Sequence, residues 1–231
     1  MTLMNKSIAV FIPAYNEADT ISNVVNGIKE LSLNLKVYVI DDGSTDDTAK
    51  NAMKSGASVI RHPINLGGGA AIRTAFTLAL SKNIDYIVTL DADCQHDPNE
   101  IPVMLDHMTD NVGIVIGSRF VDSQNISMKS YREYGIKFFS YLVSKIIRTP
   151  VTDVTSCYRI YQTREIKKVI AKINENQYYA IELLLHIAKN SDILEVPIKD
   201  LTRTAGKSKK GFFRYFYHLF RVSLKGSMIF L

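Results

Sequence analysis

Two carboxylates one residue apart, Asp91 and Asp93, follow a run of apolar residues near the middle of the chain. The run, residues 86–90, reads Tyr-Ile-Val-Thr-Leu and is typical of a buried strand. From the end of a strand both carboxylates can face one cation, and Mg²⁺ usually takes one or two protein carboxylates together with phosphate oxygens. The spacing therefore favours a clamp for a divalent cation and a diphosphate. The alternative is an ordinary turn, because aspartate is also common where a strand ends.

Two further polar segments follow predicted strands. Asp42 comes after residues 36–40, where its carboxylate could accept hydrogen bonds from a nucleobase N–H or simply belong to a turn. Residues 13–17 read Pro-Ala-Tyr-Asn-Glu. This segment could place a tyrosine ring beside a base and a carboxylate near a ribose hydroxyl, or it could be a proline-stiffened start of a helix.

Glycine and basic residues mark two loops that could meet phosphates. Residues 67–69 are three glycines, but they match neither the dinucleotide-binding pattern nor the P-loop, so we interpret them as a tight turn and helix start. Arg203 and Lys209 lie in a second loop, which could close over a bound diphosphate. Composition alone is equally compatible with a solvated basic loop.

Composition excludes several function classes. The 231 residues are 46% hydrophobic and 22% charged, as in a soluble globular protein of one large domain or a domain with an appendage. Cys94 and Cys157 form no CxxC or Cys/His cluster, and the histidines show no ligand spacing, so we expect no structural zinc. No GxSxG motif supports a serine nucleophile. No run of about 20 apolar residues predicts a complete membrane span, and the thiols fit a reducing compartment.

The net charge of +5 is concentrated near the end of the chain. Residues 201–231 hold seven Lys or Arg and no acid, which leaves 21 of the 28 basic residues against all 23 acidic ones. We therefore expect a local anionic partner such as phosphate or lipid headgroups, and no nucleic acid. Aromatic and basic residues alternate over 131–148 and 212–225, as in helices that lie on a membrane surface. The alternative is a core helix and an ordinary surface helix.

The order of predicted elements favours an open, mostly parallel α/β sheet flanked by helices. Strands and helices alternate through the first half, which is typical of successive βαβ units. Ligands in such sheets bind at the carboxyl ends of the strands, where the polar segments fall. The predicted strands cover residues 7–12, 36–40, 57–60, 86–90, 112–117 and 193–198. The predicted helices begin near residues 19, 45, 70, 98, 131, 164, 180 and 212.

Taken in order, these segments resemble family-2 glycosyltransferases with the GT-A nucleotide-sugar fold, most closely the dolichol-phosphate mannose synthases and related polyprenyl-phosphate sugar synthases. The resemblance covers about residues 7–211. The segments that carry it are 12–17, 41–44, 65–67, 91–96, 117–119, 152–156 and 203–209.

The resemblance implies a role for each matching residue. The nucleoside site would comprise Pro13, Tyr15, Glu17 and Asp42. A Mg²⁺ or Mn²⁺ bridging the diphosphate would be held by Asp91, Asp93 and Gln95, with Ala92 also in the donor site. Arg119 would lie near the acceptor phosphate, and Arg203 and Lys209 would grip the donor phosphates. Asp153, with Asp93, would be catalytic.

The implied reaction is inverting transfer of a hexose from a nucleotide-diphosphate sugar, of GDP-mannose or UDP-glucose type, to a polyprenyl phosphate such as dolichyl or undecaprenyl phosphate. Residues 1–211 would form the catalytic domain and residues 212–231 a basic membrane-surface helix, which places the protein in the cytoplasm, peripheral to a membrane. Many relatives continue into transmembrane helices, whereas this chain ends at Leu231. Three interpretations are open: the chain is a short form, its membrane part is a separate membrane-spanning partner subunit, or its end was removed. One departure is Cys157, where the family usually has glycine, which could alter the sugar or acceptor pocket.

Three alternatives remain open on the sequence. Transfer to a sugar hydroxyl of a glycolipid or polysaccharide would need a general base, Asp153 or Glu182. A nucleotidyltransferase of similar architecture would release pyrophosphate instead of a nucleoside diphosphate. A non-catalytic nucleotide-sugar-binding subunit is opposed by the intact set of Asp91, Asp93 and Gln95.

Overall fold

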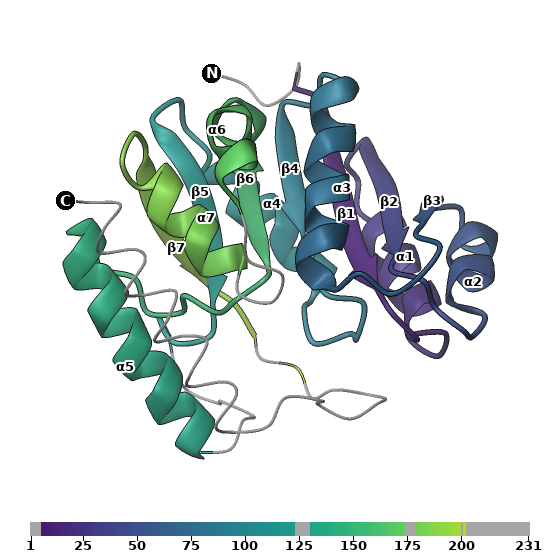
Figure 1. Cartoon of the computed structure of the whole chain (residues 1–231), viewed down its shortest axis with the longest axis horizontal. Coiled ribbons are helices and arrows are strands. Elements are labelled where there is room, and N and C mark those ends of the chain that lie inside the picture. The colour runs from purple at the N-terminus through teal and green to yellow at the C-terminus, as the bar shows by residue number, and fades with distance from the viewer. Residues whose placement is uncertain (1–5, 123–129, 174–178, 200, 202–231) are drawn as a thin grey trace.

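A single mixed sheet organises the described part of the chain (Figure 1). The computed structural model describes residues 6–122, 130–173, 179–199 and 201, with only the backbone of Ser130. The strands are β1 (Ile8–Ala14), β2 (Leu35–Asp41), β3 (Ser58–Arg61), β4 (Tyr86–Thr89), β5 (Val112–Ser118), β6 (Arg159–Gln162) and β7 (Asp192–Pro197). They lie in the order β3-β2-β1-β4-β6-β5-β7.

The direction of the strands confirms the predicted sheet with one addition. β1 pairs in parallel with β2 and β4, β2 with β3, and β5 with β7. β6 lies between β4 and β5 and is antiparallel to both. Sequence analysis predicts no strand at residues 159–162, because four residues that begin with Arg and end with Gln show neither alternation nor a long apolar run. β7 forms an edge of the sheet, which suits its terminal Pro197.

Helices cover both faces of the sheet (Figure 1). They are α1 (Ile21–Lys29), α2 (Thr48–Lys54), α3 (Gly68–Ser81), α4 (Ile101–Asp106), α5 (Ser130–Ile147), α6 (Thr163–Val169) and α7 (Tyr179–Ile187), with 3₁₀ turns at Pro98–Glu100 and Ile170–Lys172. α1, α2 and α4 contribute to the core on one face, and α3, α5, α6 and α7 to the core on the other.

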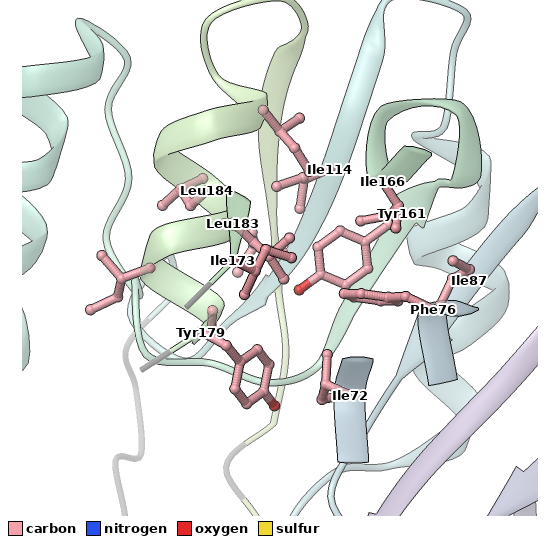
Figure 2. Close-up of a cluster of buried hydrophobic side chains, with 14 of the residues drawn as sticks. Ile72, Phe76, Ile87, Ile114, Tyr161, Ile166, Ile173, Tyr179, Leu183 and Leu184 are labelled. Atoms are coloured by element: carbon pink, nitrogen blue, oxygen red, sulfur yellow. The ribbon is translucent and has the colours of Figure 1, made fainter. Parts of the chain in front are cut away.

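The periodicity of apolar residues explains this packing. In α1 the buried residues recur at helical spacing, at Ile21, Val24, Val25 and Ile28. On the opposite face, the rings of Phe76 in α3 and Tyr161 in β6 meet edge to face at 5.4 Å (Figure 2). Burial of such side chains is the main favourable contribution to folding, at roughly 25 cal/mol per Å² of apolar surface. The two cores hold the sheet rigid, so its strand ends are fixed relative to one another.

α5 closely matches the predicted helix over 131–148 and is two-sided. Ile136, Phe139, Val143 and Ile147 are buried against the sheet layer. Tyr134, Phe138 and Tyr141 are 73%, 54% and 59% exposed. One face of the helix therefore packs in the core, as the core-helix interpretation predicts, and the other presents aromatic rings to solvent, so its contact with a membrane stays a prediction. Among the described residues, no helix combines the length and the apolar character needed to cross a membrane.

Candidate active site

The carboxyl ends of the strands bring the predicted site segments to one edge of the sheet. β1, β2 and β4 are parallel, so residues 13–17, 41–44 and 91–95 lie at the same edge. β5 runs in the same direction, because β6 is antiparallel to both β4 and β5. Residues 152–158 precede β6 and therefore reach this edge as well. The segment around Arg119, at the end of β5, joins the same cluster.

The first segment is tied to the turn after β2. Asn16 has a left-handed backbone with φ of 55°, which is uncommon outside glycine. Its backbone N–H donates to Ser44 Oγ at 2.9 Å, and its Oδ1 accepts from the Thr45 N–H at 2.8 Å. Pro13, Tyr15 and Glu17 are half-buried here. The two segments predicted to hold a nucleoside are thus joined, although contact of Pro13, Tyr15 and Glu17 with a nucleoside stays a prediction.

The buried carboxylate of Asp42 holds the loop before α3. It lies 2.7 Å from His62 Nδ1 and accepts from the backbone N–H groups of Leu66 at 3.0 Å and Gly67 at 2.7 Å. His62 Nε2 lies 2.9 Å from Thr74 Oγ1. Gly67 has a φ of 96° and directly precedes α3, which confirms the interpretation of residues 67–69 as a turn and helix start. The turn alternative allowed a structural role for Asp42 but did not predict its hydrogen bonds with Leu66 and Gly67. Its contact with a nucleobase remains a prediction.

The segment after β4 presents the two predicted metal-binding carboxylates. Asp93 is only 7% exposed, and its Oδ1 accepts from the Gln95 N–H at 3.1 Å. The Asp91 N–H donates to His96 Nδ1 at 3.3 Å. Between them, Ala92 has its methyl group buried in the core, so only its backbone could face a bound nucleotide sugar. Together these contacts hold the turn by its backbone and its buried side chains.

A left-handed residue and a ring stack shape this turn further. Cys94 has a φ of 61°, which reverses the chain after Asp93. The His96 ring stacks on the Tyr158 ring with centroids 5.0 Å apart. The Tyr158 hydroxyl donates to the Asp97 carbonyl at 2.9 Å. The start of β6 therefore supports the segment that carries Asp91 and Asp93.

The donor chemistry of this turn fits a hard divalent cation. Asp91 and Asp93 offer carboxylate oxygens at a strand end, which suit Mg²⁺ or Mn²⁺ when phosphates and water complete the coordination. Among the described residues, no group of three or more His, Cys, Asp and Glu side chains is placed to hold a metal by itself.

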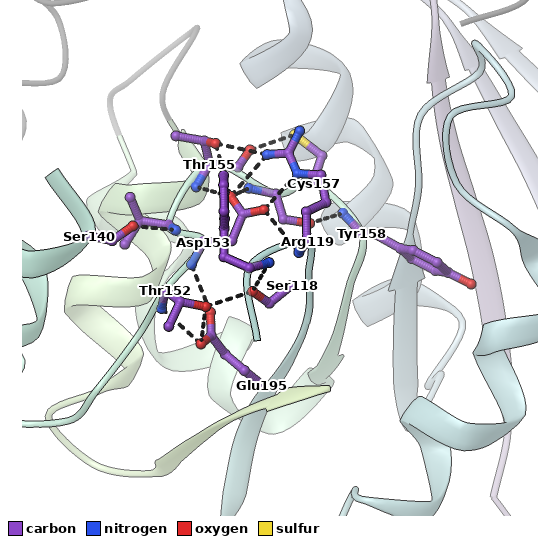
Figure 3. A network of polar contacts seen from close by, with 12 residues as sticks. Ser118, Arg119, Ser140, Thr152, Asp153, Thr155, Cys157, Tyr158 and Glu195 are labelled. Carbon is purple, nitrogen blue, oxygen red and sulfur yellow. Dashed lines mark hydrogen bonds and ion pairs between the residues drawn. The ribbon is translucent and has the colours of Figure 1, made fainter. Parts of the chain in front are cut away.

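Arg119 and Asp153 form an ion pair between the end of β5 and the loop before β6 (Figure 3). Arg119 Nε donates to Asp153 Oδ2 at 2.7 Å and Nη2 donates to Oδ1 at 3.0 Å. Asp153 is fully buried, whereas the Arg119 side chain is 17% exposed. Burial acts to raise the pKa of Asp153, but the guanidinium and a hydrogen bond from Thr155 outweigh it and hold this pKa below its ordinary value. The lowered pKa favours the ionised carboxylate, which accepts two hydrogen bonds from the Arg119 side chain.

Two residues of this site were missed by sequence analysis. Glu195 of β7 accepts from the backbone N–H groups of Thr152 at 2.8 Å and Asp153 at 2.9 Å. Arg159, fully buried in β6, donates to carbonyl groups, among them Val154 and Ser156 at 2.8 Å each. In the sequence, the only sign of these two roles is that each charged residue lies within an apolar stretch.

Glu182, the other candidate base, is buried in α7. Arg203, Lys209 and residues 212–231 lie outside the described residues.

Comparison with known proteins places the chain in a family. The family model for glycosyl transferase family 2 matches residues 9–170. An uncharacterized protein of Methanocaldococcus jannaschii is 31% identical over 84% of this chain and 81% of its own. The polyprenol monophosphomannose synthase of Mycolicibacterium smegmatis is 27% identical over 87% of this chain and 79% of its own. The UDP-N-acetylglucosamine–dolichyl-phosphate N-acetylglucosaminyltransferase of Methanococcus voltae is 28% identical over 96% and 98%.

The fold agrees with this assignment. Glucosyl-3-phosphoglycerate synthase from Mycobacterium tuberculosis, solved with Mg²⁺ and uridine diphosphate, superposes with a TM-score of 0.74 over 98% of this chain and 81% of its own, at 18% identity. The predicted GT-A fold class, a mostly parallel sheet flanked by helices, is confirmed. Because the family model covers most of the chain, the chain belongs to glycosyl transferase family 2.

Proposed function

We propose that this glycosyltransferase transfers a hexose, with inversion and with Mg²⁺ or Mn²⁺, from a nucleotide-diphosphate sugar of GDP-mannose or UDP-glucose type to a polyprenyl phosphate. Three kinds of support agree. The segments expected for the donor lie at one sheet edge. A buried carboxylate contacts an arginine that follows β5 at the same edge. The names of two relatives refer to polyprenol or dolichyl-phosphate chemistry.

The single observation that carries the proposal is the two-point contact between Arg119 and Asp153. A guanidinium has five N–H donors in a planar fork that matches phosphate. Asp153 accepts from Nε and Nη2, and the Thr155 hydroxyl also accepts from Nη2, at 3.1 Å. Arg119 is thereby held as a phosphate-binding group at the end of β5. A phosphate is already anionic at neutral pH and needs no general base before it attacks.

The same contact weakens the alternative in which a hydroxyl is the acceptor. That reaction needs a base, and Asp153 is the first candidate. Its lowered pKa makes it a poor proton acceptor, and both its oxygens already accept from Arg119. Glu182 is buried in a helix. The structure thus favours a role for Asp153 in orienting Arg119 over the catalytic role implied by the resemblance.

Residues Asp91, Asp93 and Gln95 would hold the divalent cation, which when bound supplies positive charge to the departing diphosphate. Arg203 and Lys209 are proposed to add charge there from the loop over 203–211. The nucleoside is proposed to lie between residues 13–17 and the turn that Asp42 holds. Sequestering the diphosphate among these groups stabilises the leaving group without any group having to donate a proton to it.

α5 supplies a surface for the lipid part of the acceptor. A groove of ≈ 770 Å³ lies between α5 and residues 148–152. Its lining combines apolar and basic side chains and includes Phe120, Lys137, Tyr141, Lys145 and Arg148. Thr152 lines the groove too, and both Phe120 and Thr152 are sequence neighbours of the Arg119–Asp153 pair. We therefore propose that a lipid chain in this groove has its phosphate at Arg119.

We propose the matching cellular arrangement. Residues 1–211 form the catalytic domain, and residues 212–231 add a basic helix at the membrane surface. The protein would lie peripherally on the cytoplasmic face, where sugar nucleotides are available, with a membrane-spanning subunit as a candidate partner. The exposed rings of α5 and its lysines suit a headgroup layer.

The test is a panel of radiolabelled sugar nucleotides offered with undecaprenyl or dolichyl phosphate and Mn²⁺. The expected result is label in the organic phase from one donor and release of the nucleoside diphosphate. Free sugars and 3-phosphoglycerate serve as comparison acceptors. Transfer to those acceptors alone would replace the proposal with hydroxyl transfer, and release of pyrophosphate would replace it with nucleotidyl transfer.

A further inference from the structure

Glu195 sits behind the acceptor site on the neighbouring strand. It lies in β7, opposite Ile116 of β5. Its Oε1 accepts from the Asp153 N–H at 2.9 Å. Its Oε2 accepts from both the N–H and the hydroxyl of Thr152 at 2.8 Å each. One carboxylate thus grips two successive residues of the loop that carries the partner of Arg119.

The hydroxyl groups of Thr152 and Ser118 connect Glu195 to the two residues that flank Arg119 in the sequence. Ser118 Oγ lies 2.7 Å from Thr152 Oγ1. Since the single Thr152 hydroxyl proton goes to Glu195, the Ser118 hydroxyl must be the donor of this pair. Ser118 Oγ in turn accepts from the Phe120 N–H at 3.2 Å. A directed series of hydrogen bonds therefore runs from Phe120 through Ser118 and Thr152 to Glu195. Figure 3 shows its part from Ser118 to Glu195.

We propose that Glu195 is a positioning residue of the acceptor site, which orients Arg119 through Asp153 on one side and through Ser118 on the other. The described contacts of its oxygens all come from donors, so the ionised form suits the site. Burial raises the pKa of Glu195, the hydrogen bonds from Asp153 and Thr152 lower it, and the Asp153 charge raises it again. The net effect is a pKa above the ordinary value, because the hydrogen bonds offset only part of the cost of burying this carboxylate.

The chemistry of the grip predicts that glutamine cannot replace Glu195. Two backbone N–H groups point at two different oxygens, and glutamine turns one of these oxygens into an NH₂ donor that opposes an N–H. Aspartate is one methylene shorter. Glu195→Gln should therefore break the hydrogen bond to the backbone N–H of either Thr152 or Asp153, while the volume of the side chain stays nearly the same.

The effect on Arg119 can be measured without any substrate. In the full-length ¹⁵N-labelled protein, the Arg119 Nε–H signal is identified by its absence in Arg119→Lys. We expect slow hydrogen exchange in the wild type, because this N–H donates to buried Asp153, and exchange at least about tenfold faster in Glu195→Gln. The control is Glu165→Gln, which removes a buried carboxylate that binds Lys168 on α6. Unchanged exchange in Glu195→Gln, or equal acceleration in Glu165→Gln, would overturn the inference.

Steady-state kinetics test whether the orientation of Arg119 affects use of the acceptor, a consequence that rests on the proposed function. Glu195→Gln should lower kcat/KM for polyprenyl phosphate by about tenfold while the Kd of the nucleoside diphosphate changes by less than about twofold. A parallel loss of nucleotide affinity would show general damage and contradict the inference. A wild type that transfers nothing to polyprenyl phosphate would refute the proposed function alone, because the exchange experiment still decides the role of Glu195.

A second variant covers the case in which Glu195→Gln does not fold. Thr152→Val keeps both backbone N–H groups and removes only the hydroxyl that links Ser118 to Glu195. We expect a smaller, few-fold acceleration of Arg119 exchange. Exchange at the wild-type rate in Thr152→Val would then contradict the proposed series of hydrogen bonds.

Discussion

Nε and Nη2 of Arg119 lie 2.7 and 3.0 Å from the two carboxylate oxygens of Asp153, so that the end of β5 and the loop before β6 meet in a two-point ion pair. The pair is buried on the Asp153 side and partly open on the Arg119 side. This asymmetry suits a guanidinium that contacts a ligand on its exposed side while the buried carboxylate fixes its orientation.

Arg119→Lys should separate charge from orientation. Lysine keeps the positive charge but cannot reproduce the planar two-point contact. We expect kcat/KM for the phosphate acceptor to fall by about a hundredfold, as for the loss of a charged hydrogen-bonded contact, while nucleotide affinity changes little. Steady-state kinetics with each substrate varied in turn, together with calorimetric titration of the nucleoside diphosphate, measures both. Wild-type kinetics in the lysine variant would remove Arg119 from acceptor binding.

Asp153→Asn should destabilise the fold as well as the reaction. Removing one partner of a buried ion pair leaves the other charge without compensation and costs about 3 kcal/mol of unfolding free energy. Urea denaturation at neutral pH measures this loss. A change below about 0.5 kcal/mol would mean that the pair contributes nothing to stability.

The stability difference between the wild type and Asp153→Asn should depend on pH in one direction. The pKa of Asp153 is held below its ordinary value of 3.8. Its contribution to stability is therefore complete above that value and is lost as the pH falls through the lower pKa of the folded state. The stability difference between the wild type and Asp153→Asn should shrink below about pH 4. A difference that stays constant down to acid unfolding would contradict the pKa direction.

Gly43→Ala tests the turn that Asp42 holds. Gly43 has a φ of 71°, and a Cβ there would lie 2.4 Å from the Ile64 carbonyl carbon. We expect a loss of about 1–3 kcal/mol in stability and weaker nucleotide binding, because residues 64–67 must move. The matched control is Gly68→Ala at the start of α3, where a Cβ meets no atom within 4 Å. Equal effects of the two substitutions would show that the turn geometry is unimportant.

Phe138→Ser tests the membrane surface of α5. The ring is 54% exposed, and transfer of a phenylalanine side chain from water into an apolar layer gains about 1.5–3 kcal/mol. Partitioning into anionic phospholipid vesicles should fall by about tenfold. The control is Val103→Ser on α4, where the valine is 51% exposed on the other face of the sheet. A similar loss in both variants would exclude a specific membrane role for α5.

The sequence predicts the parts of the site that are local. An apolar run followed by Asp91 and Asp93 specifies a strand end, and the alternation of strands and helices places such ends at one edge. The role of Glu195 is not local, because its partners Thr152 and Asp153 lie more than 40 residues earlier and meet it only through the pairing of β5 with β7. β6 is missed for a related reason: four residues in the middle of a sheet derive their conformation from two neighbouring strands.

Other outcomes depend on side-chain geometry that spacing does not encode. The spacing marks Asp42 as a strand-end carboxylate, but its grip on Leu66 and Gly67 follows from a loop more than 20 residues later. Asp153 is predicted as a catalytic group from the resemblance. Its burial and its contact with Arg119 fit a role in orienting that arginine, and its catalytic role stays a prediction. Such roles follow from the fold as a whole.

The central claim, cation-assisted transfer of a sugar to a lipid phosphate at Asp91 and Asp93, is tested most directly by radiolabel transfer into the organic phase with Mn²⁺ present and then chelated. We expect wild-type transfer to stop on chelation and return with Mn²⁺. Asp93→Ala should transfer at most about a thousandth as fast under all conditions, and Asp106→Ala, at an exposed carboxylate on α4, should match the wild type. Retained turnover in Asp93→Ala, or wild-type transfer that is indifferent to chelation, would contradict the claim.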